Sequence, residues 1–112
     1  MELHPYKTTG GKNLILEYIN NLSKNEKIDG LTVLEYMEDD RLDELSIKTW
    51  RGSIQEVYFF RHNRIFYVAI ENEKAYLLHA CRKQKNKTEK KDADIIIKRA
   101  KELGEKISKK LV

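Results

Sequence analysis

The sequence has few of the features that mark secreted or membrane proteins. Its 112 residues include one cysteine, Cys81, and one proline, Pro5. A single cysteine excludes an internal disulfide. No apolar run approaches the roughly 20 residues of a membrane-spanning helix, and the N-terminus shows no apolar segment of the kind found in signal peptides. We therefore expect a cytoplasmic protein with no membrane contact.

Motifs for metals and nucleotides are also missing. The three histidines, His4, His62 and His79, are scattered, and no HxxxH or CxxC spacing occurs. Metal sites need His, Cys, Asp or Glu ligands gathered in one place. Neither a GxxxxGK[ST] loop nor a GxGxxG motif is present. The sequence therefore predicts no metal and no cofactor.

Charge is distributed unevenly along the chain. The net charge of +4 comes from 22 basic and 18 acidic residues. Residues 82–112 carry a net charge of +7, whereas residues 1–81 carry −3. A cationic segment attracts polyanions such as RNA, DNA or anionic lipid. A solvated, lysine-rich helix face explains the same charge equally well.

Apolar spacing predicts two helices after a short strand at residues 3–6 and a turn at Gly10-Gly11. Asn13 is the expected N-cap of the first helix, and Ser23 with Glu26 gives a capping-box pattern for the second. The expected core faces are formed in the first helix by Leu14, Ile15, Tyr18, Ile19 and Leu22, and in the second by Ile28, Leu31, Leu34 and Met37.

Three segments rich in β-branched and aromatic residues follow, at 54–60, 65–70 and 75–81. Short polar connections between them predict an antiparallel meander. A basic loop at 82–91 leads into a last helix, whose apolar face is Ile96, Ala100, Leu103, Ile107 and Leu111. We expect one α+β domain over residues 1–112, with two N-terminal helices, a small antiparallel sheet and a C-terminal helix.

The meander brings the turn at 61–64 and the basic loop to the same end of the sheet. Such a cluster of cations suits RNA cleavage, in which the 2′-hydroxyl attacks the adjacent phosphate without a metal. Arginine and lysine stabilise the charge on phosphorus, and histidine or a lysine of lowered pKa transfers protons. The candidate catalytic residues are Arg61, Arg64, His79, Lys83 and Lys87, and the candidate RNA-binding residues are Arg82, Lys85, Lys90 and Lys91.

Each candidate also has a structural interpretation. Arg64 can cap the hairpin or pair with Glu56, and the lysines can be ordinary loop residues. His79 can be a hydrogen-bonded core imidazole, because it lies in an apolar strand. Cys81 is expected to pack under the sheet edge and not to act as a nucleophile.

The stretch from Ile47 to Thr88 resembles the phage-derived HigB-like branch of the RelE toxin superfamily. The family pattern W/Y-E-L-R corresponds to residues 55–58 (QEVY), and R-[VIL]-x-[YF] corresponds to 64–67 (RIFY). The pattern L-L-H-x-F-x-K-K-T-x-K-T-P corresponds in part to LLHACRKQKNKTE, residues 77–89. The chain departs from these patterns at Tyr58 (Arg in the family), Cys81 (Phe), Gln84 (Lys), Lys85 (Thr) and Glu89 (Pro).

This resemblance implies a RelE-like fold and a cytoplasmic toxin that inhibits translation by cutting mRNA, with the ribosome as a partner. It also implies a cognate helix-turn-helix antitoxin of the HigA/Xre type. Arg64, Lys83 and Lys87 are the positions that match the family's basic residues. The alternative is a non-catalytic RNA- or DNA-binding protein or a phage-derived interaction protein, that is, a degenerate toxin.

Overall fold

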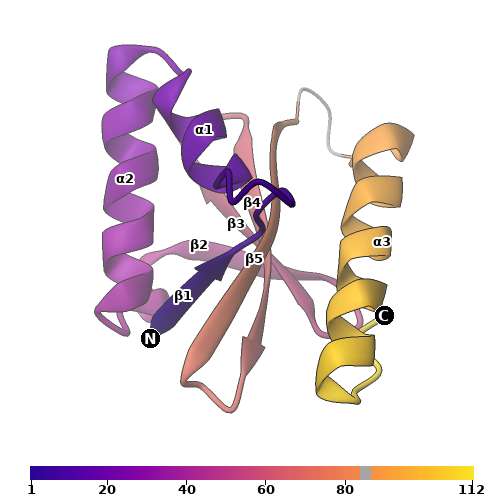
Figure 1. Ribbon diagram of the computed structural model, residues 1–112. Coiled ribbons are helices and arrows are strands. Elements are labelled where there is room, and N and C mark those ends of the chain that lie inside the picture. The colour runs from indigo at the N-terminus through magenta and orange to yellow at the C-terminus, as the bar shows by residue number, and fades with distance from the viewer. Residues whose placement is uncertain (84–86) are drawn as a thin grey trace.

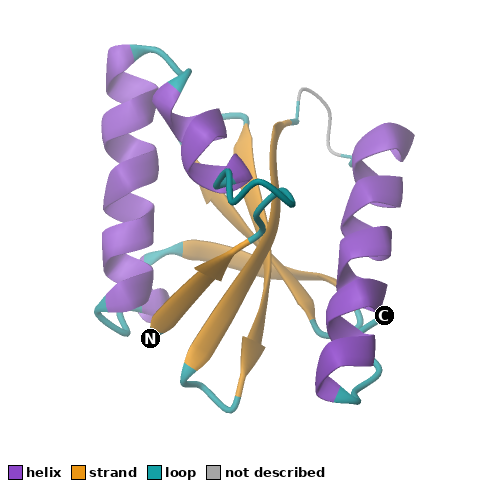
Figure 2. Cartoon of the chain, in the orientation of Figure 1, coloured by secondary structure: helices purple, strands orange, loops and turns teal. Residues whose placement is uncertain are grey.

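A five-stranded sheet separates two layers of helices in the computed structural model (Figure 1), which describes residues 1–83 and 87–112. The strand order is β1-β5-β4-β3-β2. Figure 2 shows α1 and α2 on one side of the sheet and α3 on the other. The elements are β1 (Glu2–Pro5), α1 (Leu14–Asn20), α2 (Lys24–Glu38), the 3-10 helix η1 (Leu42–Glu44), β2 (Ser46–Arg51), β3 (Ile54–Phe59), β4 (Asn63–Ile70), β5 (Lys74–Arg82) and α3 (Lys90–Ile107).

The predicted α+β class, with helices before and after an antiparallel meander, is confirmed. Strands β2 to β5 form that meander, but β1 pairs in parallel with the first half of β5, so the sheet is mixed. Strand β2 was not predicted, because its exposed side chains interrupt the apolar pattern. Among the described residues, no helix is long and apolar enough to cross a membrane.

Each face of the sheet has its own apolar core. Helices α1 and α2 cover a core that includes Ile15, Ile19 and Met37. Helix α3 covers a second core, in which Ile96 and Ala100 are buried as predicted. The predicted N-cap of α1 is also confirmed, because Oδ1 of Asn13 accepts a hydrogen bond of 3.0 Å from the backbone N–H of Leu16.

The predicted core face of α2 was right only in its C-terminal half, where Met37 is buried and Leu34 packs against the core. Ile28 and Leu31 are 54% and 39% exposed, whereas Gly30 and Val33 face the sheet. A Cβ atom at Gly30 would lie 2.9 Å from the ring of Phe59, so the missing side chain lets the helix approach the strand. This close contact fixes which side of α2 is buried.

Ser23 is the N-cap residue of α2, but the predicted capping box is not formed. The Ser23 side chain makes no capping hydrogen bond to the backbone. Its hydroxyl instead donates a hydrogen bond of 2.6 Å to the Glu26 carboxylate. That carboxylate is buried and accepts further bonds from the sheet, so it draws the serine into a tertiary network.

Strand β5 contains one extra residue relative to β4. The register shifts between Phe66, which pairs with His79, and Tyr67, which pairs with Leu77. Leu78 is the additional residue, and such a bulge changes the face to which the following side chains point. Leu77 consequently packs in the α1–α2 core, whereas Leu78 packs in the α3 core.

The chain beyond α3 folds back against the turn between β2 and β3. The helix ends at Ile107, and Ser108 adopts a left-handed backbone conformation. Leu111, which was predicted to lie on the apolar face of the helix, is therefore beyond the end of the helix but is still buried in the α3 core. Its carbonyl accepts a hydrogen bond of 2.8 Å from the backbone N–H of Ser53.

Candidate functional site

The strand register places several polar residues on the α3 face of the sheet. Tyr58, Arg64 and Cys81 are paired across β3, β4 and β5. Glu56 and His79 belong to the neighbouring cross-strand row. Directly paired residues point to the same side of a sheet, so all five lie on one face. We refer to these residues together with Lys83 as the polar face.

The turn at 61–64 and the start of the basic segment lie at the same end of the sheet, as the sequence predicted. Asn63 pairs with Arg82 in the register of β4 and β5. The backbone N–H of Lys83 donates a hydrogen bond of 2.6 Å to the carbonyl of His62. These backbone contacts bring Lys83 beside the β3–β4 turn.

Glu56 is the buried acidic centre of the polar face. Its Oε1 atom accepts a hydrogen bond of 3.0 Å from Nζ of Lys83. The same oxygen lies 3.2 Å from Nε of Arg64, an ion pair without hydrogen-bond alignment. Within residues 1–83 and 87–112, no donor reaches Oε2. Sequence reasoning named Glu56 only as a possible partner of Arg64, and its place in the middle of an apolar strand was the available signal.

Arg64 is held by contacts on several sides. Its guanidinium lies 3.9 Å from the centre of the Tyr58 ring, a cation–π arrangement. Its Nη1 atom donates to the carbonyls of Arg61 (3.1 Å) and Asn63 (3.0 Å). Both structural roles considered from the sequence, capping the turn and pairing with Glu56, are therefore present. These contacts engage Nε and Nη1 of the guanidinium.

His79 connects β5 to α3. Its Nε2 atom lies 2.8 Å from Oδ1 of Asp92, and its Nδ1 atom lies 3.4 Å from Nη1 of Arg99. Burial lowers the pKa of His79 despite the neighbouring carboxylate. A neutral imidazole fits these contacts, because Nε2–H can donate to Asp92 while Nδ1 accepts from Arg99. The geometry matches the core-imidazole interpretation of His79.

Cys81 lies beside this pair. A nitrogen of His79, the sulfur of Cys81 and a carboxylate oxygen of Asp92 all lie within 4.8 Å of one another. Burial raises the pKa of the Cys81 thiol to about 12, which disfavours a role as a nucleophile. The sequence did not reveal this cluster, because Asp92 lies on a different element, in the first turn of α3.

Arg82 points into a separate network on the α2 side. Its Nη2 atom donates a hydrogen bond of 2.8 Å to Oε1 of Glu26. The amide of Asn63 donates to the same oxygen, at 3.1 Å, and the hydroxyl of Tyr18 donates to Oδ1 of Asn63, at 2.6 Å. Hydrogen bonds from Ser23 and Asn63, together with Arg82, lower the pKa of Glu26 to about 2. Arg82, predicted to bind RNA, is therefore engaged in an internal ion pair while its side chain remains 42% exposed.

The other predicted cations that the structure describes are not members of the polar face. Arg61 is exposed in the turn and has a left-handed backbone (φ 69°). Lys87, Lys90 and Lys91 are exposed before and within the first turn of α3. Lys85 lies outside the described residues. The structure thus brings Arg64 and Lys83 together on one face with His79, and leaves the other cations at the surface.

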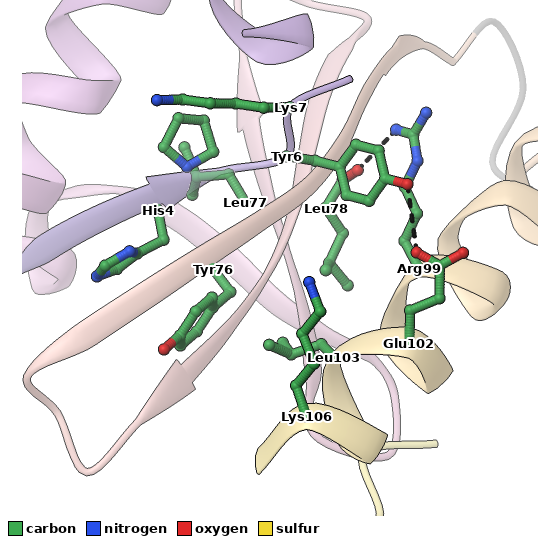
Figure 3. A pocket seen from close by; sticks show the side chains of 11 residues that line it. His4, Tyr6, Lys7, Tyr76, Leu77, Leu78, Arg99, Glu102, Leu103 and Lys106 are labelled. Atoms are coloured by element: carbon green, nitrogen blue, oxygen red, sulfur yellow. Dashed lines mark hydrogen bonds between the residues drawn. The ribbon is translucent and has the colours of Figure 1, made fainter. Parts of the chain in front are cut away.

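A cleft on the same side of the sheet adjoins His79 through Arg99. It has a volume of about 340 Å³ and lies between β1, β5 and α3 (Figure 3). The Arg99 guanidinium lies 4.1 Å from the centre of the Tyr6 ring, and the Tyr6 hydroxyl donates a hydrogen bond of 3.2 Å to Glu102. Tyr6, Arg99 and Glu102 in this cleft are therefore already in contact with one another.

A comparison with models of protein families identifies the family of this chain. The family model described as Phage derived protein Gp49-like (DUF891) matches residues 17–101, most of the sequence. The chain belongs to the Gp49-like family. This family consists of RelE/toxin-like proteins, which places the chain in a toxin–antitoxin context. Among curated proteins, no match to the chain is found.

The matched region of this Gp49-like protein contains every predicted site residue. It runs from α1 through the whole meander and into α3. Strand β1 lies outside the match, and so does the segment of chain that packs against the β2–β3 turn. The polar face thus belongs to the part of the fold that the chain shares with its family.

Proposed function

We propose that this Gp49-like protein is the toxin of a toxin–antitoxin module of the RelE/HigB-like kind. It inhibits translation by cutting mRNA without a metal, in the cytoplasm and on the ribosome. The observation that carries this proposal is the fixed position of Arg64 on the polar face, between Tyr58 and Glu56. A guanidinium held in advance can stabilise charge on phosphorus without first being reorganised.

The proposed reaction uses the RNA's own 2′-hydroxyl as nucleophile. The 2′-oxygen bonds to phosphorus while the bond to the 5′-oxygen breaks, which leaves a 2′,3′-cyclic phosphate and a 5′-hydroxyl. Arg64 and Lys83 stabilise the phosphoryl charge. The neutral imidazole of His79, on the same face, accepts the proton of the 2′-hydroxyl after its weak Arg99 contact opens, and Lys87 protonates the leaving 5′-oxygen.

The proposed RNA path extends over the cations around the polar face. Arg61, Arg82, Lys90 and Lys91 lie at or near the same end of the sheet and are exposed enough to meet flanking phosphates. Such contacts supply affinity that falls as salt is raised. The proposed antitoxin is a helix-turn-helix protein of the HigA/Xre type, which neutralises the toxin by binding it.

The test is cleavage of a defined mRNA in a cell-free translation reaction, with the new ends mapped by primer extension. We expect cuts inside the coding region that persist in EDTA and disappear when the cleaved nucleotide carries a 2′-deoxyribose. Arg64→Gln should slow cleavage about 100-fold or more. The matched control, Lys101→Gln at an exposed position of α3, should cleave at the wild-type rate.

Because Arg64 is partly buried, the thermal unfolding of each variant must be measured alongside its activity. Intact mRNA with soluble wild-type protein would overturn the proposal. Wild-type cleavage by folded Arg64→Gln would refute the assignment of Arg64.

One observation favours a second candidate, an RNA-binding protein without cleavage activity. Lys83 is committed to Glu56, and Tyr58 stands where the resembling toxins carry an arginine. A degenerate toxin of this kind would retard RNA in a gel in a salt-dependent manner and leave it intact.

A further inference from the structure

We propose that His79, Cys81 and Asp92 bind a single zinc ion where β5 meets the first turn of α3. The three residues offer a nitrogen, a sulfur and an oxygen within 4.8 Å of one another. His79 and Cys81 come from the same face of β5, and Asp92 comes from α3. All three side chains are largely buried, so they face one another and not open solvent.

The nitrogen, sulfur and oxygen ligand atoms at this site favour zinc over other metal ions. Zinc accepts imidazole nitrogen, thiolate and carboxylate ligands, whereas magnesium and calcium prefer oxygen alone. Bond lengths of about 2.0–2.3 Å in a tetrahedron separate ligand atoms by roughly 3.4 Å. The present separation of 2.8 Å between Nε2 of His79 and Oδ1 of Asp92 would need to open by only about half an ångström.

Zinc binding also requires the Cys81 thiol to lose its proton and the His79 imidazole to move its own. The Cys81 thiol loses its proton to solvent and binds as thiolate, so that thiolate and carboxylate together neutralise the charge of the ion. Nε2 of His79 becomes the ligand, and the imidazole proton moves to Nδ1. Arg99 then gives up its 3.4 Å contact with Nδ1 but keeps its 2.8 Å hydrogen bond to the carbonyl of Leu78.

A cleft gives the ion a way in. It has a volume of about 320 Å³ and is lined by Cys81 and Asp92, together with Tyr18 and Glu89. The cleft leaves room for a water molecule as the fourth ligand, as in zinc sites with three protein ligands. The charged side chains of the lining balance, because Arg82 and Lys91 offset Glu89 and Asp92.

The proposed zinc site shares one residue, His79, with the proposed RNA cleavage, in which no step uses a metal. Its role is to tie the first turn of α3 to β5. With zinc bound, Nδ1 of His79 carries a proton and cannot accept one from the 2′-hydroxyl. A chelator should therefore remove the ion, loosen this contact and free His79 for cleavage. Metal titration and the RNA cleavage assay in chelator are separate measurements, so either proposal can fail while the other holds.

The test is titration of chelator-treated full-length protein with Co²⁺, a spectroscopic substitute for Zn²⁺. We expect saturation at one equivalent, a near-ultraviolet thiolate-to-cobalt absorption band, and displacement by Zn²⁺. Because Cys81 is the only cysteine, such a band can arise from no other residue. No saturable binding by the wild type, or binding without the band, would overturn the proposal.

Substitutions at the proposed ligands test which residues bind the ion. Cys81→Ala should abolish the band, and Asp92→Asn should weaken Co²⁺ binding about 10-fold or more. His62→Gln, which changes an exposed histidine in the β3–β4 turn, is the matched control and should bind as the wild type does. One equivalent of Zn²⁺ should raise the thermal midpoint of the wild type more than that of Asp92→Asn. Equal increases in both proteins would also contradict the site.

Discussion

Lys83 and Glu56 form a buried ion pair of 3.0 Å, in which neither side chain is more than 5% exposed. Glu56→Gln would leave Lys83 and Arg64 without their common anion. Removing one partner of a buried pair is costly, because the remaining charge stays out of water. We expect the free energy of unfolding to fall by about 3 kcal/mol, measured by urea denaturation.

The control for this change is Glu35→Gln, at an exposed position of α2, which should alter stability little. The double variant Glu56→Gln/Lys83→Met removes both members of the pair. It should recover part of the lost stability, because no buried ammonium remains unpaired. A Glu56→Gln protein as stable as the wild type would show that the pair contributes nothing.

Acid stability should depend on Glu26. Hydrogen bonds from Ser23 and Asn63, with Arg82, lower its pKa from about 4.5 to about 2 in the folded protein. The unfolded chain therefore binds this proton at a higher pH than the folded chain does. The stabilisation is complete above about pH 4.5 and is lost as the pH falls from 4.5 towards 2.

Urea denaturation at pH 6 and pH 3 tests this prediction. The wild type should lose more stability than Glu26→Gln over this interval, and Glu35→Gln should behave as the wild type does. Equal losses in the wild type and Glu26→Gln would mean that Glu26 titrates in the folded protein as it does in the unfolded chain.

Gly30→Ala should destabilise the protein although alanine favours helices. The new Cβ would lie 2.9 Å from the Phe59 ring and 3.1 Å from Cγ2 of Ile19. The helix-propensity gain of about 1 kcal/mol is smaller than the 1–3 kcal/mol typical of overpacking, so we expect a lower thermal midpoint. Gly10→Ala, whose Cβ has no neighbour nearer than 3.9 Å, is the control. A higher midpoint for Gly30→Ala would mean that the ring of Phe59 moves freely.

The Cys81 thiol should resist alkylation in the native, metal-free protein. Burial raises its pKa to about 12, so only about one molecule in ten thousand carries a thiolate at pH 8. Iodoacetamide labelling followed by mass spectrometry should show slow modification of the native protein and rapid modification in denaturant. Rapid labelling of the native protein would contradict the buried, protonated state of Cys81.

The fold was predictable where the apolar pattern is strong. Strands β3, β4 and β5 and the buried face of α3 were anticipated, because their side chains repeat with a clear period. The N-terminal half of the inner face of α2 was not, because Gly30 has no side chain to contribute to a pattern. The parallel pairing of β1 with β5 joins the chain's beginning to a strand some 70 residues later, a contact that no local signal specifies.

The site was predictable only in part. The sequence placed Arg64, Lys83 and His79 at one end of the sheet, because strand direction and turn length determine that end. The acidic residues that contact these side chains could not be predicted from strand direction and turn length. Glu56 became the anchor through cross-strand pairing, and Asp92 reached His79 only because α3 packs over β5.

The extra residue at Leu78 determines which side of the sheet receives the rest of β5. If β5 ran through Leu78 with strict alternation and no bulge, His79 and Cys81 would point towards α1 and α2, away from Arg64 and Asp92. In an aligned set of Gp49-like sequences, any one-residue gap in this strand should therefore fall at the bulge, where loss of a residue leaves the flanking side chains on their own faces. The bulge shifts the alternation of side chains along β5 by one residue, and the contacts of the polar face with α3 depend on that shift.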